Sequence, residues 1–279
     1  MSNSAPLLSI RGLTKRFRSR AGFFSRRTHE IHALEDVSLD IPRGATLGLV
    51  GESGSGKTTL GRCILKLTTA DRGAVIWNEE EGGSTDLLTL RARALRGFRR
   101  RMQVVFQDPF HSLNPTRLVW QIVGERLFID RAHNSREIRD RAAQMLASVG
   151  LRQDCLDRLP HEFSGGQRQR IAIARALIVE PEFLVCDEVT SALDTRTQAQ
   201  VLELLREIQA RSGITLLFIS HDLHTVASMS REVVVMHAGK IVEHGTPAQI
   251  FREPAASYTR RLVQAVPHPD PRQRTFRPA

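Results

Sequence analysis

Hydrophobic and polar positions along the chain divide it into alternating and continuous stretches. Residues 7–42 alternate short apolar segments with polar ones around a basic loop at 18–30, which predicts two or three strands of an antiparallel flap. Continuous apolar runs at 45–50, 183–187 and 214–220 predict strands that are buried on both faces. Because helical stretches separate these three runs, we expect an α/β fold with a mainly parallel sheet.

A long insert separates the first two buried strands. The apolar periodicity of residues 91–158 is helical over 125–151, which predicts a helical subdomain. Residues 232–245 predict a β-hairpin that turns at Ala238 and Gly239. The last residues are rich in Pro and Arg, and we expect them to form a flexible tail. The expected organisation is one domain over 1–267, with a core at about 7–90 and 180–262, a helical subdomain at about 91–160, a further helix at 164–178 and a tail at 268–279.

Composition is consistent with this fold class, and it argues against membrane-spanning and secreted proteins and against disulfide, zinc and iron–sulfur sites. The 279 residues are 41% hydrophobic and 25% charged, as in an ordinary globular protein. No apolar stretch reaches the roughly 18 to 20 residues of a membrane-spanning helix, and the first residues lack the apolar core of a signal peptide, so we expect a cytoplasmic protein. Cys63, Cys155 and Cys186 have no C-x-x-C spacing, which favours buried thiols over disulfides, zinc or an iron–sulfur cluster.

The net charge of +10 raises the hypothesis of a nucleic-acid or membrane partner. Arginine supplies nearly all of the 40 basic residues, and it is spread along the chain with local concentrations at 91–101 and 168–175. Charge of this kind does not define a binding stripe, and a solvated basic face is the commoner outcome. We therefore expect no nucleic-acid partner.

A glycine-rich motif supplies the first candidate chemistry. Residues 51–58 fit G-x-x-x-x-G-K-[ST] and lie between a predicted strand and a predicted helix, as a phosphate-binding loop requires. Glycines let backbone N–H groups turn toward the phosphates, and the helix presents its positive end to them. We expect Lys57 to hold the β- and γ-phosphates and the Thr58 hydroxyl to bind Mg²⁺.

Two carboxylates follow the second buried strand. Asp187 and Glu188 stand at its carboxyl end, and the third buried strand also ends in polar residues, Ser220, His221 and Asp222. Ligands bind at such strand ends in parallel sheets. We expect Asp187 to hold Mg²⁺ and Glu188 to polarise the attacking water as a general base, an effect worth about 10² to 10⁴ in rate.

With this phosphate loop, the acidic pair and the signature described next, the chain resembles the ATP-binding subunits of ABC transporters. Phe163-Ser164-Gly165-Gly166-Gln167 and the helix that follows resemble the family's LSGGQ signature, with Phe in place of Leu. Ser164 is a natural N-cap, and the glycines allow an anion to approach a helix N-terminus, which gives one chain a second phosphate-binding surface. The resemblance implies that two subunits sandwich two ATP molecules, each completing the other's site.

The remaining motif positions match the family one by one. Gln107 resembles the glutamine that contacts Mg²⁺ and the attacking water, His221 the histidine that reaches the γ-phosphate, and Phe17 the aromatic residue that stacks on adenine. The family's usual proline after the acidic pair is Val189 here, which leaves the carboxylates intact. The resemblance thus implies an ATPase whose nucleotide site contains Phe17, Gly51, Glu52, Ser53, Gly54, Ser55, Gly56, Lys57, Thr58, Thr59, Ser164, Gly165, Gly166 and Gln167, with Lys57, Gln107, Glu188 and His221 in catalysis and Thr58, Gln107 and Asp187 at the metal.

Several strings resemble the peptide and nickel importer branch of the family. They are Gln107-Asp108-Pro109, Ser112-Leu113-Asn114-Pro115, Pro160-His161, Tyr258-Thr259 and the basic loop with Phe23 and Phe24. The branch implies a second ATPase subunit, with a heterodimer favoured over a homodimer, two membrane permeases, an external binding protein and a place on the cytoplasmic face of the inner membrane. Because no cysteine follows Cys186, we expect the branch's C-terminal iron–sulfur cluster to be absent.

Some alternatives stay open. The transported molecule could be a dipeptide, an oligopeptide, nickel or an antimicrobial peptide, since it never touches this chain. The arginines of 91–101 could face a permease or anionic headgroups, or form a solvated helix face. Two other classes, a soluble ABC-type ATPase acting on nucleic acid and a phosphate-transferring kinase, fit less well, because the chain has one phosphate loop and a signature that a kinase does not need.

Overall fold

The computed structural model describes residues 5–20, 28–108, 112–130 and 133–265. Phe23 and Phe24 of the basic loop, Pro109 of the first branch motif and the predicted tail at 268–279 lie outside the described residues. Within the described ranges, no helix combines the length and the apolar character needed to cross a membrane.

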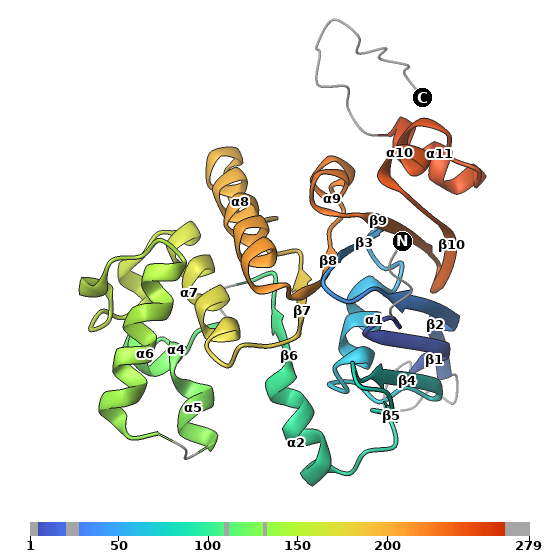
Figure 1. Cartoon of the computed structure of the whole chain (residues 1–279). Coiled ribbons are helices and arrows are strands. Elements are labelled where there is room, and N and C mark those ends of the chain that lie inside the picture. Colours follow the sequence, from blue (N-terminus) through green and yellow to red (C-terminus); the bar gives the residue numbers. More distant parts are fainter. Residues whose placement is uncertain (1–4, 21–27, 109–111, 131–132, 266–279) are drawn as a thin grey trace, which may run out of the picture.

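A six-stranded sheet forms the centre of the molecule, in the order β10-β9-β3-β8-β7-β6 (Figure 1). Five of its strands are parallel, and β10 pairs antiparallel with β9. The three runs predicted as buried strands are β3, β7 and β8, and each is buried along its whole length. The strands are β3 (Thr46–Val50), β6 (Met102–Val105), β7 (Phe183–Asp187), β8 (Thr215–Ile219), β9 (Glu232–His237) and β10 (Lys240–Gly245).

A second, antiparallel sheet packs beside the first. Its order is β2-β1-β4-β5, so the predicted flap gains two strands from residues after the phosphate loop. β1 and β2 pair along nearly their whole length, with Phe17 opposite Ile31. The strands are β1 (Leu8–Arg20), β2 (Thr28–Ile41), β4 (Arg72–Asn78) and β5 (Ser84–Asp86).

The helices occupy separate parts of the molecule. In Figure 1, α4, α5, α6 and α7 form a group that is set apart from α1 and the antiparallel sheet, while α10 and α11 follow β10 toward the end of the chain. Side-chain caps fix several starts: Asn134 caps α6, Ser164 caps α7 and Asp194 caps α8. The helices are α1 (Lys57–Ile64), α2 (Ala92–Arg101), α4 (Val119–Val123), α5 (Glu125–Asp130), α6 (Ser135–Ser148), α7 (Gly165–Leu177), α8 (Thr195–Ser212), α9 (Leu223–Met229), α10 (Pro247–Arg252) and α11 (Ser257–Gln264).

Two hydrophobic cores lie on the two faces of the parallel sheet. Successive side chains of a strand point to opposite faces, so Leu184 and Cys186 join the core beneath α7 and α8, whereas Phe183 and Val185 join the core shared with α1 and the antiparallel sheet. Because both faces are covered, the sheet offers its charged residues to solvent mainly at its strand ends.

The structure adds two details to the predicted insert. Within 91–158, where we expected a helical subdomain, Met102–Val105 form β6, the edge strand beside β7. Four residues are too few to show periodicity, and pairing with β7 decides their conformation. The continuous helical pattern after Glu125 is also divided into α5 and α6, where the capping box of Asn134 and Glu137 starts a new helix.

Candidate functional site

The phosphate-loop motif folds as its sequence predicts. It connects the buried end of β3 to the first residue of α1, and Gly51, Gly54 and Gly56 have φ values of 150°, 81° and 106°. A Cβ on Gly51 would lie 2.2 Å from the Met236 carbonyl oxygen, and one on Gly56 would lie 2.4 Å from that of Ala33. Glycine is therefore required at both positions by close backbone approach as well as by conformation.

Lys57 lies inside this loop with its side chain buried. Its Nζ donates hydrogen bonds to the carbonyl oxygens of Gly51 and Glu52, both at 2.8 Å, and to Ser55 Oγ at 3.3 Å. Burial lowers the pKa of Lys57 below its usual value, although Glu188 and Asp187 act in the opposite direction. The ammonium is thus held at the centre of the loop, close to two carboxylates.

The strand ends bring the predicted acidic residues to this loop. Asp187, the last residue of β7, accepts a hydrogen bond from Thr58 Oγ1 at 3.0 Å, and burial raises its pKa. Glu188 adopts a φ of 50°, a conformation that is uncommon outside glycine and recurs at functional sites. The Nδ1 atom of His221 lies 3.3 Å from Glu188 Oε1. The expected meeting of these residues at one sheet edge is confirmed.

A cavity of about 410 Å³ lies against the loop and this edge. Gln107 lines it, and also lines a neighbouring cavity of about 550 Å³ that contains Thr58 and Asp187. Gln107 thus stands where the two spaces meet, beside the predicted metal ligands. The first cavity is lined by Phe17, Ile31, Ala33, Ser53, Gly54, Gly56, Lys57, Thr58, Thr59, Gln107 and Glu188.

Several residues that line these cavities were not predicted as site residues. Ile31 is 59% exposed and pairs across the strands with Phe17, which is 44% exposed, so the two form an open apolar surface. Their pairing register could have been inferred only by aligning the two strands of the predicted flap. Arg62 and Arg175 line the second cavity. Arg175 belongs to the helix that follows the signature, whereas no local motif marks Arg62.

The signature residues lie elsewhere. The Ser164 hydroxyl accepts a hydrogen bond from the Gln167 amide, which confirms the expected N-cap, and Gly166 packs so closely on α8 that a Cβ would lie 2.2 Å from Thr197. In Figure 1, α7 stands in the helical group, on the other side of β6 and β7 from α1. Among the residues that the structure describes, no hydrogen bond or ion pair joins Ser164–Gln167 to the phosphate loop.

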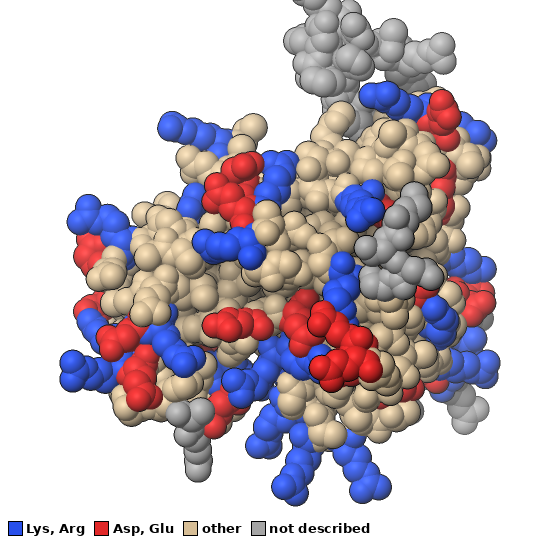
Figure 2. Space-filling model, in the orientation of Figure 1, with Lys and Arg blue, Asp and Glu red and all other residues tan. Residues whose placement is uncertain are grey.

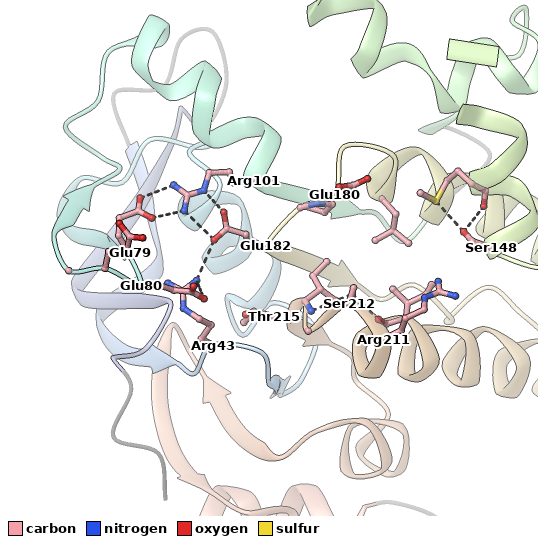
Figure 3. Close-up of a pocket in the computed structure, with 18 residues that line it drawn as sticks. Arg43, Glu79, Glu80, Arg101, Ser148, Glu180, Glu182, Arg211, Ser212 and Thr215 are labelled. Atoms are coloured by element: carbon pink, nitrogen blue, oxygen red, sulfur yellow. Dashed lines mark hydrogen bonds and ion pairs between the residues drawn. The ribbon is translucent and has the colours of Figure 1, made fainter. Parts of the chain in front are cut away.

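A cavity of about 940 Å³ lies at the opposite edge of the sheet, where the parallel strands begin (Figure 3). None of the predicted site residues lines it. Arg101 lies between two carboxylates there, donating to Glu79 at 2.6 and 2.7 Å and to Glu182 at 2.5 Å. These hydrogen bonds lower the pKa of Glu79 and raise that of Arg101. The larger cavity therefore carries an ion-pair network, whereas predicted site residues line the smaller ones.

The cysteines and potential metal ligands add no further site. All three thiols are buried, and burial raises the pKa of Cys63 to about 11 and that of Cys186 to about 12. Within the described ranges, no group of three or more His, Cys, Asp or Glu side chains converges on a metal position. The thiols therefore have the properties of core residues.

Comparison with known proteins agrees with this geometry. A family described as ABC transporter matches residues 34–191, which span the phosphate loop, the signature and the acidic pair. The chain is 47% identical over 272 residues to a Brucella ovis protein named "Putative peptide import ATP-binding protein", covering 98% of this chain and 82% of that one. It is 46% identical to the glutathione import ATP-binding protein GsiA of Salmonella typhimurium, covering 95% of this chain and 42% of GsiA.

Solved structures give the same result. The dimeric bacterial ABC transporter cassette MJ0796 has a TM-score of 0.74 and 28% identity, over 86% of this chain and 98% of that one. The cbiO1 protein of Clostridium perfringens, part of the ABC transporter complex cbiONQ, also has a TM-score of 0.74 and 28% identity, over 89% and 92% of the two chains. Another structure of MJ0796, at 27% identity over 86% of this chain and 98% of that one, with a TM-score of 0.74, is a post-hydrolysis dimer bound to ADP and Pi. The chain therefore belongs to the ABC transporter family, as one of its ATP-binding and ATP-hydrolysing subunits.

Proposed function

We propose that this subunit hydrolyses Mg-ATP at the carboxyl edge of its parallel sheet to drive import of a peptide-class solute. The observation that carries the proposal is the convergence of the phosphate loop with Asp187 and Glu188, through the hydrogen bond from Thr58 Oγ1 to Asp187 Oδ1 at 3.0 Å. ATP phosphates would take the inward-facing amides of the loop and the Lys57 ammonium. Phe17, with Ile31 beside it, would stack on the adenine.

The residues present fit a Mg²⁺ ion. The Thr58 hydroxyl and the Asp187 carboxylate supply oxygen ligands of the kind that Mg²⁺ takes, and both line one cavity with Gln107. Mg²⁺ held there would neutralise charge on the phosphate oxygens. The buried Asp187 carboxylate, whose pKa is raised, is the type of group whose ionised form a cation stabilises.

The hydrolytic step would use the two residues that follow these ligands. Glu188 Oε1 would accept a proton from the attacking water, and His221, 3.3 Å away, would hold that carboxylate and reach the γ-phosphate. Gln107 would orient the same water from the far side of the cavity. Each of these roles acts on the substrate side of the sheet edge, where a bound γ-phosphate would lie.

The separation of the signature from the phosphate loop supports a two-subunit site. Ser164, Gly165, Gly166 and Gln167 present a capped helix N-terminus, and among the described residues the phosphate loop of the same chain lies on the other side of β6 and β7. We infer that these residues complete the site of a second ATPase subunit, with a different subunit favoured over a second copy. Sedimentation of the Glu188→Gln variant with Mg-ATP tests this choice, because a tight dimer of this chain alone would contradict the need for a different partner.

The relatives' names indicate the solute. The Brucella ovis relative is named for peptide import, and the Salmonella typhimurium relative is named for import of glutathione, which is a tripeptide. We therefore propose a di- or oligopeptide as the solute rather than nickel or an antimicrobial peptide. The subunit would lie on the cytoplasmic face of the inner membrane. It would act with two permeases in the membrane and with a binding protein outside it. On the face shown in Figure 2, long basic side chains extend from the edge where Figure 1 shows α2, whose exposed arginines are available to a permease.

An uptake assay tests the proposal as a whole. In cells that carry the gene, its deletion should abolish uptake of labelled trialanine, and a wild-type copy should restore it. A Glu188→Gln copy should fail to restore uptake although the protein is present. Nickel uptake, measured in the same strains, should not change. Normal trialanine uptake in the deletion strain, or loss of nickel uptake instead, would contradict the proposed solute class.

A further inference from the structure

The first peptide of the phosphate loop is held from both sides. The carbonyl oxygen of Gly51 accepts a hydrogen bond from Lys57 Nζ at 2.8 Å. The N–H of the same peptide, which belongs to Glu52, donates to the hydroxyl of Tyr258 at 3.1 Å. One contact comes from inside the loop and the other from α11, a helix that lies outside the residues matched by the family.

Two anchors fix the position of the Tyr258 hydroxyl. The ring is almost fully buried and stacks on His237 at the end of β9, with ring centroids 4.0 Å apart and planes inclined by 29°. The carboxylate of Glu243 accepts hydrogen bonds from the amides of Ala255 at 2.7 Å and Ala256 at 3.1 Å, which ties the start of α11 to β10. The hydroxyl therefore reaches the loop from a rigid support.

The β9–β10 turn holds a later part of the same loop. The Gly239 amide donates to the Ser55 carbonyl oxygen at 3.0 Å, and the Met236 carbonyl lies directly behind Gly51. The outer side of the loop is thus supported by backbone groups of the turn and, at its first peptide, by the side chain of Tyr258. Support of this kind leaves the inner side of the loop open toward the 410 Å³ cavity.

We propose that Tyr258 is a positioning residue for the phosphate loop, which holds the Gly51–Glu52 peptide in place when Lys57 turns to the phosphates. The inference rests on the proposed function, because it assigns the Lys57 ammonium to ATP. An ammonium has three N–H donors, and those of Lys57 are taken by Gly51, Glu52 and Ser55. Donation to oxygens of both the β- and γ-phosphates would leave one donor for these three partners, so at least one of the hydrogen bonds to the Gly51 and Glu52 carbonyls would be lost. The peptide then keeps its contact with Tyr258, and the loop retains the shape that binds the nucleotide.

Removal of one hydroxyl tests this role. Tyr258→Phe keeps the ring on His237 and removes the acceptor for the Glu52 amide. We expect the KM for ATP to rise about three- to tenfold, as for loss of one hydrogen bond, while kcat stays within twofold. The dissociation constant of Mg-ATP, measured in a Glu188→Gln background, should rise by the same factor. Ser257→Ala removes the exposed neighbouring hydroxyl of α11 and should leave both values unchanged.

The chain's one tyrosine also provides a local probe. Because the contact with Glu52 is kept in the proposed role, the ¹⁹F signal of protein labelled with 3-fluorotyrosine should stay close to its free position when Mg-ATP saturates the Glu188→Gln variant. A signal that moves to the position of a solvent-exposed tyrosine at saturation, or a Tyr258→Phe variant with unchanged KM and affinity, would overturn the positioning role while ATP binding stands. If the wild-type protein bound no ATP, the proposed function itself would fail and this inference with it.

Discussion

The two edges of the parallel sheet use charge in opposite ways. Where the strands begin, hydrogen bonds between Arg101 and Glu79 lower the pKa of the carboxyl and raise that of the guanidinium, so both ionised forms are stabilised. Where the strands end, burial lowers the pKa of Lys57 and raises that of Asp187, so both ionised forms are destabilised. The first edge pairs its charges with one another, whereas the second holds an ammonium and a carboxylate whose ionised forms burial disfavours.

Cavity size would have pointed to the wrong edge. The space at the strand beginnings is about 940 Å³, more than twice the 410 Å³ beside the phosphate loop. Four of its charged side chains, Arg43, Arg101, Glu79 and Glu182, already contact one another, as Figure 3 shows. The electrostatic state of the lining residues, rather than volume, therefore distinguishes the edge that carries the predicted site from the edge that carries the ion pairs.

The largest expected difference between the edges is in catalysis. Glu188→Gln should reduce kcat for ATP hydrolysis by about 10² to 10⁴, because the general base is lost while the shape is kept. Glu182→Gln makes the same chemical change at the other edge and should leave kcat within twofold. Steady-state phosphate release from both variants checks the prediction. Equal losses in the two variants would show that the edges do not differ as described.

Replacement of Arg101, at the other edge, should lower stability and leave catalysis unchanged. Arg101→Ala removes the hydrogen bonds to Glu79 and Glu182 and a cation–π contact, since its guanidinium lies 4.6 Å from the Trp77 ring centroid. Because these side chains are partly exposed, we expect a loss of about 1 to 2 kcal/mol in unfolding free energy, with kcat unchanged. Urea unfolding measures it. Arg99→Ala, at the exposed neighbouring position, should change stability by less than about 0.5 kcal/mol; a fall in kcat of Arg101→Ala without loss of stability would contradict the structural role.

The smallest expected effect is a pH dependence of stability that has opposite directions at the two edges. The folded-state pKa of Asp187 is raised, so its ionisation opposes folding above its unfolded-state pKa. Asp187→Asn should therefore raise the melting temperature by about 1 to 3 °C at pH 7, and the gain should fade as pH falls from the raised folded-state pKa to the unfolded-state pKa near 3.9. Ionisation of Glu79 has the opposite effect on stability. Because the folded-state pKa of Glu79 is lowered, its carboxylate stabilises the fold above the unfolded-state pKa, and this contribution is lost as pH falls through the folded-state pKa. Thermal melts from pH 7 to pH 3 measure both, and a gain for Asp187→Asn that persisted at pH 3 would contradict the assignment.

The sequence predicted the parts of this fold and site that local patterns encode. Strands β3, β7 and β8 are continuous apolar runs that end in motif residues, so the loop and the acidic pair could be assigned to one sheet edge. The turn at Ala238 and Gly239 was also predicted, and both residues have positive φ. The conformations at these places are decided by neighbouring residues in the chain.

The rest depends on contacts between distant segments. β6 is too short to show a period, and only its pairing with β7 makes it a strand. Tyr258 was noted as part of a branch motif, but its contact with Glu52 joins residues 206 positions apart. Similarly, Ile31 enters the nucleotide cavity through the register of β1 and β2. Contacts of this kind form only when distant segments pack together, so the neighbouring sequence shows no pattern that predicts them.

The location of bound nucleotide tests the account most directly. A crystal structure of the Glu188→Gln variant with Mg-ATP should place the γ-phosphate beside Lys57, within reach of His221, and should place Ser164 of a second subunit against it. The 940 Å³ cavity at the other edge should hold no nucleotide. Nucleotide bound in that cavity, or a γ-phosphate at the phosphate loop with no signature residue near it in any assembly, would contradict the account.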